Sequence, residues 1–347
     1  MRVYETIRVE PEEENKRLDQ LLRRHYPSLT QGVIEKVCRK GELLIDGEKT
    51  KPSVRVMSGQ TLYLPALLNL PTRSDEYMKT FDHTQSDLKL IQSAVIYIDN
   101  DIIVINKPSG LASQGGSGQG NRHVDALTTA LTYGFKARPR LVHRLDRDTS
   151  GLLVLARTER VAGRLSEAFR QRKVKKVYWA LVSGVPQSRS GIIRFGLLKS
   201  SKRGEERMLC INPDEIDKVE GAKRAVTQFK VIAARGSSMA WLALNPVTGR
   251  THQLRAHLEQ IGHPIVGDEK YGGKGHDSMG KGWGAGSGLD LEWRLHLHAR
   301  SLAFEHPVSG QLVDFVAPLP HHMQRTWHYF GWSELEGRDD TKLCLDE

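Results

Sequence analysis

The sequence has only three cysteines in 347 residues, Cys38, Cys210 and Cys344, and they are far apart. The absence of a Cys-x-x-Cys pair argues against a zinc site, and three scattered thiols do not form the disulfide framework of a small secreted protein. The sequence also lacks an apolar run near the roughly 20 residues of a membrane span, and its N-terminus has no apolar signal segment. We therefore expect a soluble cytoplasmic protein without a membrane partner.

Acidic side chains are outnumbered by basic ones, with 41 Asp or Glu against 51 Lys or Arg and a net charge of +10. The excess is concentrated between Lys136 and Lys176, where thirteen Lys or Arg face four Asp or Glu, a net of +9. A solvated surface usually mixes the two signs, so this segment favours a face that binds a polyanion such as nucleic acid. An ordinary charged surface is the alternative.

The length allows two domains. In the first 65 residues, apolar spacing predicts helices at 17–26 and 31–40, the second capped by Thr30, and Asp46-Gly47 is typical of a hairpin turn. The rest of the chain reads as an α+β domain with a mixed or antiparallel sheet. The predicted divisions are a small domain at 1–65, a linker at 66–90, a large domain at 91–332 and an acidic tail at 333–347.

Glycine-rich segments at 115–120 and 272–288 could suggest nucleotide binding. The second lacks the Gly-Lys-Ser/Thr of a phosphate-binding loop, and the first does not open an evident helix. We interpret both as loops, and the role of 272–288 stays open.

The segment LVHRLDRDTSGLLVLAR, residues 141–157, places two carboxylates among several cations before an apolar strand. An arginine close to Asp146 would favour its charged form, as a nucleophile or general base requires, although the spacing by itself favours a surface ion pair. Asp148 precedes Thr149 and Ser150 in a pattern typical of a turn. A hydrolase built on Ser150 or Asp148 is a remote alternative, because neither has a positioned partner.

Two other segments carry candidate residues. Tyr178 shares a strand face with Ala180 and Val182, so it is either a half-buried core residue or a platform on which a base stacks. In TGRTHQLRAH, residues 248–257, the two histidines are five apart, which does not suit a helical metal pair. Two arginines at a helix start are disfavoured by the helix dipole, which suggests that at least one faces an anion.

Together, HRLDRDTSG, KKVYWALVSG and TGRTHQLRAH resemble the HRLDxxTSG, KxYxAxVxG and TGRxHQLRxH motifs of the RluA-type family of pseudouridine synthases. INKPSGL (105–111), HPIVGDEKYG (263–272) and LHARSLAFEHP (297–307) fit the same family, so the resemblance covers about 94–318. Residues 1–65 resemble an S4 RNA-binding domain. They depart from its pattern at Thr30-Gln31, where Ser-Arg is usual, so RNA contact there would depend on Lys36, Arg39 and Lys40.

The resemblance implies an isomerase that converts specific uridines in large-subunit (23S) ribosomal RNA to pseudouridine, without a cofactor or metal and as a monomer. It implies that Asp146 is the catalytic carboxylate, that Tyr178 packs on the target base and that Arg255 pairs with Asp146. Arg144 would occupy the gap left by the flipped base. The remaining predicted RNA contacts of the catalytic domain are His143, Arg147, Arg250 and His252. A tRNA substrate, or a non-catalytic RNA-binding or ribosome-assembly factor, is the alternative.

Overall fold

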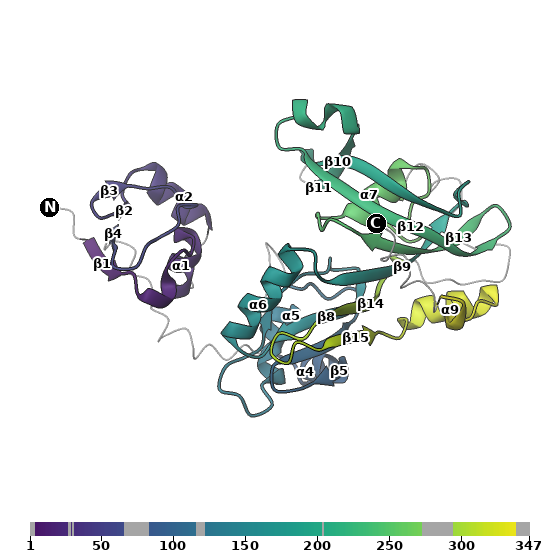
Figure 1. Ribbon diagram of the computed structural model, residues 1–347, viewed down its shortest axis with the longest axis horizontal. Helices are drawn as coiled ribbons and strands as arrows, with labels where there is room; N and C mark the ends of the chain where they lie inside the picture. The colour runs from purple at the N-terminus through teal and green to yellow at the C-terminus, as the bar shows by residue number, and fades with distance from the viewer. Residues whose placement is uncertain are drawn as a thin grey trace. The chain divides into compact units, whose positions relative to one another are not determined.

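The computed structural model separates an N-terminal unit, Met1–Phe81, from a larger unit, Asp82–Glu347 (Figure 1). It describes residues 4–26, 29, 31–65, 83–115, 122–202, 205–272 and 294–337. Within these ranges, no helix is both long enough and apolar enough to cross a membrane.

The N-terminal unit packs two helices against a four-stranded sheet with the order β1-β4-β2-β3. Leu18, Leu21 and Leu22 are buried along one face of the first helix, as their spacing predicts. Asp46 and Gly47 both have positive φ angles, 50° and 87°, which is the backbone that a two-residue hairpin needs. Thr30, the predicted cap, lies outside the described residues. The elements are β1 (Tyr4–Arg8), η1 (Pro11–Glu13), α1 (Leu18–His25), α2 (Gln31–Arg39), β2 (Leu44–Ile45), β3 (Glu48–Lys49) and β4 (Thr61–Pro65).

The larger unit is built on one eleven-stranded sheet. The main path is β11-β10-β12-β13-β9-β14-β8-β6-β5, with β15 paired to β14 and β7 paired to β8. Among the described strands, only β8 and β14 pair in parallel, so the predicted α+β class with a mixed sheet is confirmed. The strands are β5 (Val95–Ile98), β6 (Ile102–Lys107), β7 (Arg140–Leu141), β8 (Ser150–Ala156), β9 (Lys175–Ser183), β10 (Ser190–Lys202), β11 (Glu205–Ile211), β12 (Lys223–Arg235), β13 (Met239–Pro246), β14 (Leu297–Glu305) and β15 (Leu312–Val316).

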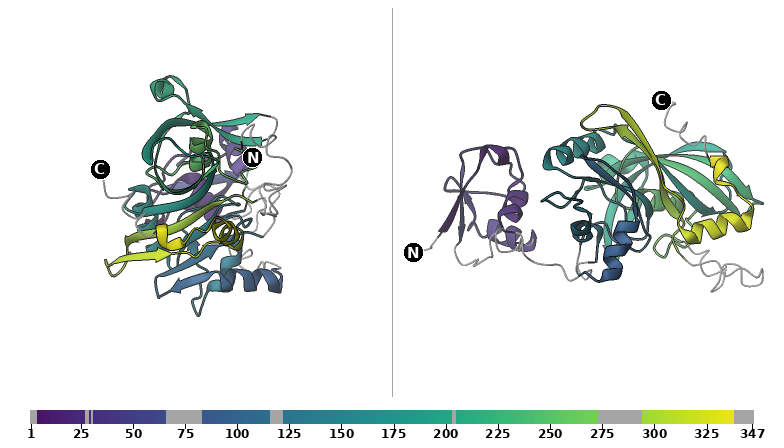
Figure 2. Two further views of the ribbon diagram at one scale, coloured as in Figure 1. Left: turned by 90° about the vertical axis from the view of Figure 1, so that its right-hand side faces the viewer. Right: turned by 90° about the horizontal axis from the view of Figure 1, so that it is seen from below.

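Helices cover both faces of this sheet, which explains why its central strands are apolar throughout (Figure 2). The side chains of β6 alternate: Ile102 and Val104 pack with α6, whereas Ile103 and Ile105 pack with α4 and α5. The helical segments are α4 (Gln85–Ser93), α5 (Val124–Leu127), η3 (Thr128–Leu131), α6 (Glu159–Arg170), η4 (Pro213–Lys218), α7 (Gln253–Gln260) and α9 (His321–Phe330).

The same alternation on β9 decides where its tyrosine lies. Trp179 and Leu181 pack with α9, whereas Ala180 and Val182 pack with α7 on the opposite face. Tyr178 therefore lies on the α7 face, as its predicted period of two requires. This face also carries the site described below.

Two predicted boundaries differ from the structure. The linker was placed at 66–90, but α4 begins at Gln85, because Thr84 caps it by accepting a hydrogen bond from the Asp87 backbone N–H at 3.2 Å and Ile91 anchors it in the core. The tail was placed at 333–347, but Glu334 pairs with Arg300 at 2.7 Å. Residues 338–347 and most of both glycine-rich segments lie outside the described residues.

Candidate active site

A cleft of about 790 Å³ is lined by all three sequence motifs. Asp146 reaches it from the loop before β8, Tyr178 from β9 and Arg255 from α7. The three residues predicted to carry the chemistry are far apart in sequence and meet in this one cavity.

The backbone beside Asp146 is held from both directions. The Ser113 hydroxyl accepts a hydrogen bond from the N–H of Leu145 at 3.0 Å and donates to its carbonyl at 2.7 Å. On the other side, the Arg147 carbonyl accepts from Lys107 Nζ at 3.0 Å. The loop is therefore fixed one residue before and one residue after the carboxylate, which orients it before any substrate arrives.

Lys107 is fully buried, which is rare for a lysine. Its ammonium donates to three backbone carbonyls, those of Pro108 (3.0 Å), Leu111 (2.7 Å) and Arg147 (3.0 Å). Burial lowers the pKa of Lys107 to about 7, against the opposing effect of nearby acidic side chains. INKPSGL resembles a family segment, but nothing in its sequence marks this lysine as the residue that fixes the loop carrying Asp146.

His143, which is predicted to contact RNA, lines the cleft and also holds the loop that carries Asp146. Its Nε2 accepts a hydrogen bond from the Val154 backbone N–H at 2.9 Å, and its ring stacks on Phe169 with centroids 4.2 Å apart. Burial, and then the charge of Lys176, lowers the pKa of His143 to about 3. The ring is neutral at physiological pH, so it fastens the loop to β8 and presents no charge to a phosphate.

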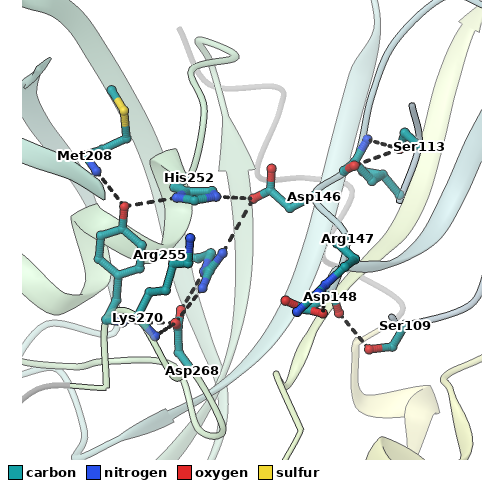
Figure 3. Close-up of polar contacts among 12 residues, drawn as sticks. Ser109, Ser113, Asp146, Arg147, Asp148, Met208, His252, Arg255, Asp268 and Lys270 are labelled. Carbon is teal, nitrogen blue, oxygen red and sulfur yellow. Dashed lines mark hydrogen bonds and ion pairs between the residues drawn. The ribbon is translucent and has the colours of Figure 1, made fainter. Parts of the chain in front are cut away.

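Asp146 faces two donors from the segment that opens α7 (Figure 3). Its Oδ2 lies 3.9 Å from Arg255 Nη1 and 3.8 Å from His252 Nε2. The shortest contacts of Arg255 go elsewhere: both oxygens of buried Asp268 accept from it at 2.6 Å. The pairing implied by the resemblance is thus present, but Asp268 is the closer partner and sets the direction of the guanidinium.

Arg255 is charged although it is buried. Burial opposes the charge, but the hydrogen bonds and charge of Asp268, together with the charge of Asp146, outweigh it and raise the pKa of Arg255. A fixed positive group therefore lies 3.9 Å from the carboxylate that is predicted to be catalytic.

Tyr178 is half-buried in the cleft wall. Burial, and then the charge of Asp146, raises its pKa well above the usual range for tyrosine. The phenol therefore keeps its proton at neutral pH, and its ring offers an aromatic face to the cavity.

The remaining predicted contacts divide by location. Arg144, Arg147 and Arg250 are exposed and line the cleft, as predicted for RNA contacts. Arg147 also pairs with Asp148 at 3.0 Å. From the cation-rich segment, Arg170, Arg172 and Lys176 line the cleft as well. The other three predicted contacts, Lys36, Arg39 and Lys40, are exposed on α2 in the N-terminal unit.

Known proteins resemble this chain along most of its length. The model of the RNA pseudouridylate synthase family matches residues 101–260. The ribosomal large subunit pseudouridine synthase C of Rickettsia typhi is 36% identical over 310 residues, which cover 89% of this chain and 95% of that protein. The enzyme of the same name from Salmonella typhi is 33% identical over 325 residues, covering 92% and 94%.

The chain belongs to the RNA pseudouridylate synthase family. Solved structures agree: human RNA Pseudouridylate Synthase Domain Containing 4 is 28% identical, with a TM-score of 0.54 and coverage of 70% of this chain and 94% of that one. The family prediction made from the three motifs is confirmed.

Within the family motif TGRTHQLRAH, Gln253 has a role that the sequence analysis missed. Its buried amide accepts from the Thr248 hydroxyl at 2.7 Å and from the Arg250 N–H at 3.1 Å. It also donates to the Val226 carbonyl at 2.9 Å and to the Thr227 hydroxyl at 3.0 Å. These four hydrogen bonds use both the oxygen and the nitrogen of the amide, and they hold the turn before α7 against β12. The only sequence signal was its place next to His252 in the motif.

The hydrolase alternative finds no support in the structure. The Ser150 hydroxyl lies 2.9 Å from His298 Nδ1, but both residues are buried and neither lines the cleft. Burial lowers the pKa of His298 to about 3. Asp148 pairs with Arg147 at the surface, as expected for a turn residue.

One group of side chains in the described residues, Asp99, Asp101 and His306, has the spacing of a metal site. The Nδ1 atom of His306 accepts from two backbone N–H groups, those of Val308 (3.4 Å) and Ser309 (3.1 Å). The proton is therefore on Nε2, which faces Asp99 Oδ2 at 3.2 Å. Within the described residues Nε2 makes no hydrogen bond, and the protonated nitrogen faces Asp99 without a lone pair to offer a metal.

Proposed function

We propose that this pseudouridine synthase isomerises specific uridines of large-subunit ribosomal RNA. The observation that carries the proposal is a rigidly held carboxylate, Asp146, in a cation-lined cleft beside the aromatic face of Tyr178. The substrate class follows the relatives that are named ribosomal large subunit pseudouridine synthase C.

The reaction breaks the N1–C1′ bond of uridine, turns the uracil and joins C5 to C1′. The proton on C5 is removed and N1 gains one, so the conversion is an isomerisation without net oxidation. The target nucleotide must leave its stack, at a cost of a few kcal/mol. Arg144, which lines the cleft, would fill the gap, and Tyr178 would stack on the extruded base. Asp146 acts as the nucleophile or as the base that removes the C2′ proton.

The decisive experiment replaces Asp146 with Asn, which keeps the shape and removes the charge. We expect RNA affinity to stay within about threefold and product formation to fall by on the order of 10³-fold or more. Asp148→Asn is the matched control, because it removes the same charge two residues away on the same loop and should leave turnover near the wild-type value. Product is measured as pseudouridine in a single-turnover assay, and isomerisation that survives Asp146→Asn contradicts the proposal.

The substrate is tested separately. Single-nucleotide mapping of pseudouridine in total RNA from a strain without the protein should show sites lost from large-subunit ribosomal RNA. Losses confined to tRNA would support the alternative substrate instead.

A further inference from the structure

A chain of polar groups leads from strand β11 to Asp146 (Figure 3). The backbone N–H of Met208 donates to the Tyr271 hydroxyl at 2.8 Å. That hydroxyl lies 3.1 Å from Nδ1 of His252, and Nε2 of the same imidazole faces Asp146 Oδ2 at 3.8 Å. The sequence motifs placed His252 among the RNA contacts, but this arrangement directs it at the reactive carboxylate.

The direction of each hydrogen bond in the chain can be derived. A backbone N–H only donates, so the Tyr271 oxygen accepts from Met208. Tyr271 is fully buried, and within the described residues its own proton has one acceptor, His252 Nδ1. In a neutral imidazole whose Nδ1 accepts, the proton is on Nε2. His252 therefore presents an N–H group to Asp146.

The charge state of the imidazole agrees with this direction. Burial lowers the pKa of His252, although the charge of Asp146 opposes the shift. The charged groups around the ring are Asp146 from the loop before β8, Arg255 from α7, and Asp268 and Lys270 from the loop after α7. The ring is consequently neutral at pH 7 and interacts with the carboxylate through an N–H dipole.

The backbone of His252 is strained. Its φ angle is 50°, in the left-handed region that non-glycine residues seldom adopt. The residue occupies the N-cap position of α7, but its side chain makes no capping hydrogen bond. The ring is used for the contacts with Tyr271 and Asp146 instead.

We propose that His252 is a positioning residue for Asp146, and that Tyr271 fixes the imidazole tautomer that this requires. The inference rests on the proposed function of Asp146. His252 and Arg255 converge on the same oxygen, Oδ2, and Figure 3 shows the other oxygen directed away from both donors. The two donors hold Oδ2 and leave Oδ1 for the reaction. Their contacts of 3.8 and 3.9 Å shorten when RNA fills the cleft, since catalytic hydrogen bonds tighten in the substrate complex.

Two substitutions at His252 separate this role from RNA contact. Asn tolerates the left-handed backbone, and its amide reaches the position of Nδ1 but not of Nε2. Gln places an N–H donor near Nε2. We expect His252→Asn to lower kcat by about 10–100-fold with KM within about threefold, and His252→Gln to recover to within about fivefold of wild type. A raised KM with unchanged kcat in His252→Asn would make His252 an RNA contact and overturn the proposal.

The tautomer is tested without RNA. In the full-length protein labelled with ¹⁵N-histidine, the His252 signal, identified by its loss in His252→Asn, should report a proton on Nε2. Tyr271→Phe keeps the buried ring and should shift this signal toward a mixture of tautomers, while kcat falls severalfold. A proton on Nδ1 in the wild type refutes the proposal. An active Asp146→Asn variant with the expected His252 tautomer would instead refute the proposed function.

Discussion

Two carboxylates two residues apart have different surroundings, and this separates their roles. Asp148 pairs with Arg147 at 3.0 Å, where both side chains are well exposed, at 40% and 58%. Such a surface pair contributes about 0–1 kcal/mol. Asp146 faces Arg255, whose side chain is only 6% exposed, and His252, at 14%. The side chain of Asp146 is itself 32% exposed, but its two partners are largely buried, so solvent screens these contacts less than the Asp148–Arg147 pair.

Replacing Tyr178 with Phe tests whether its hydroxyl takes part in proton transfer. The ring remains, so RNA affinity should stay within about threefold, whereas product formation should fall by about 10²-fold if the phenol moves a proton. Tyr178→Leu also removes the stacking face and should weaken binding by about 1–3 kcal/mol. Binding is measured by titration with an RNA fragment and product by single turnover; full activity of Tyr178→Phe excludes a proton-transfer role.

Lys107→Met tests the buried support of the active loop. The substitution leaves three carbonyls without their donor, so we expect a loss of about 3–5 kcal/mol of unfolding free energy and a slower reaction. Urea unfolding measures the first effect. The control is Lys89→Met, at an exposed position, which should change stability by less than about 0.5 kcal/mol. Equal stability of the two variants would show that the Lys107 contacts contribute little.

At the scale of elements, the parallel pairing of β8 and β14 depends on Gly151. Its φ angle is 111°, and an added Cβ would collide with the backbone of Ala299 in the neighbouring strand. This steric restriction explains why a glycine ends the segment HRLDRDTSG. It also fixes the position of β8, the strand that follows the loop carrying Asp146.

Gly151→Ala should therefore destabilise the protein by several kcal/mol, because the clash is with backbone that cannot move aside easily. Gly163→Ala in α6 is the control: nothing lies within 4 Å of its added Cβ, and alanine favours a helix by about 1 kcal/mol. Thermal unfolding should show a fall for the first variant and no fall for the second. The same melting temperature in both variants would contradict the conclusion that the pairing of β8 with β14 requires glycine at position 151.

Two buried histidines, His296 just before β14 and His298 within it, have a pH response of definite sign. Burial lowers the pKa of His296 and of His298 to about 3, below the usual 6.5. Between pH 6.5 and 3 the unfolded chain binds protons that the folded chain excludes, so stability falls as the pH falls through this window. Each group contributes up to about 1.4 kcal/mol per pH unit.

The dependence is measured from urea midpoints between pH 7 and pH 4. His298→Asn should make the fall in stability shallower, because the variant lacks one histidine that binds a proton only in the unfolded chain. His328→Gln, at an exposed position on α9, should leave the slope as it is in the wild type. An unchanged slope in His298→Asn would show that this histidine is not kept neutral by burial.

At the scale of the whole molecule, the N-terminal unit offers a second cationic surface. We propose that this unit is an RNA-binding domain, as its resemblance to S4 domains implies, and that exposed Lys36, Arg39 and Lys40 contact phosphates. Together with the cleft, it would give the enzyme two separate contacts with its RNA.

The triple substitution of these three residues by Ala tests the proposal. We expect weaker RNA binding and a salt dependence reduced by about two to three counterions, with the single-turnover rate at saturating RNA unchanged. A control that removes the same charge, Lys218, Lys223 and Arg235 to Ala, should retain the wild-type salt slope. Equal slopes in both variants would remove α2 from the RNA contacts.

Local pattern was sufficient to predict several of the helices and strands, whereas the choice of Asp146 as the catalytic carboxylate came from the family resemblance and stays a prediction. Helical spacing of Leu18, Leu21 and Leu22 and the alternation around Tyr178 survive in the structure, because period and burial follow directly from side-chain order. The linker boundary was wrong, because the cap and the single buried Ile91 that hold α4 leave little periodic signal.

Tertiary structure decided which polar groups meet. Lys107, Gln253 and Asp268 are buried, and their partners come from other loops and strands, so no local pattern distinguishes them from surface residues. For the same reason, the sequence alone did not show that His143 bonds the Val154 backbone or that His252 faces Asp146. Sequence order sets side-chain type and period, whereas desolvation and hydrogen-bond partnership depend on the packing of distant segments.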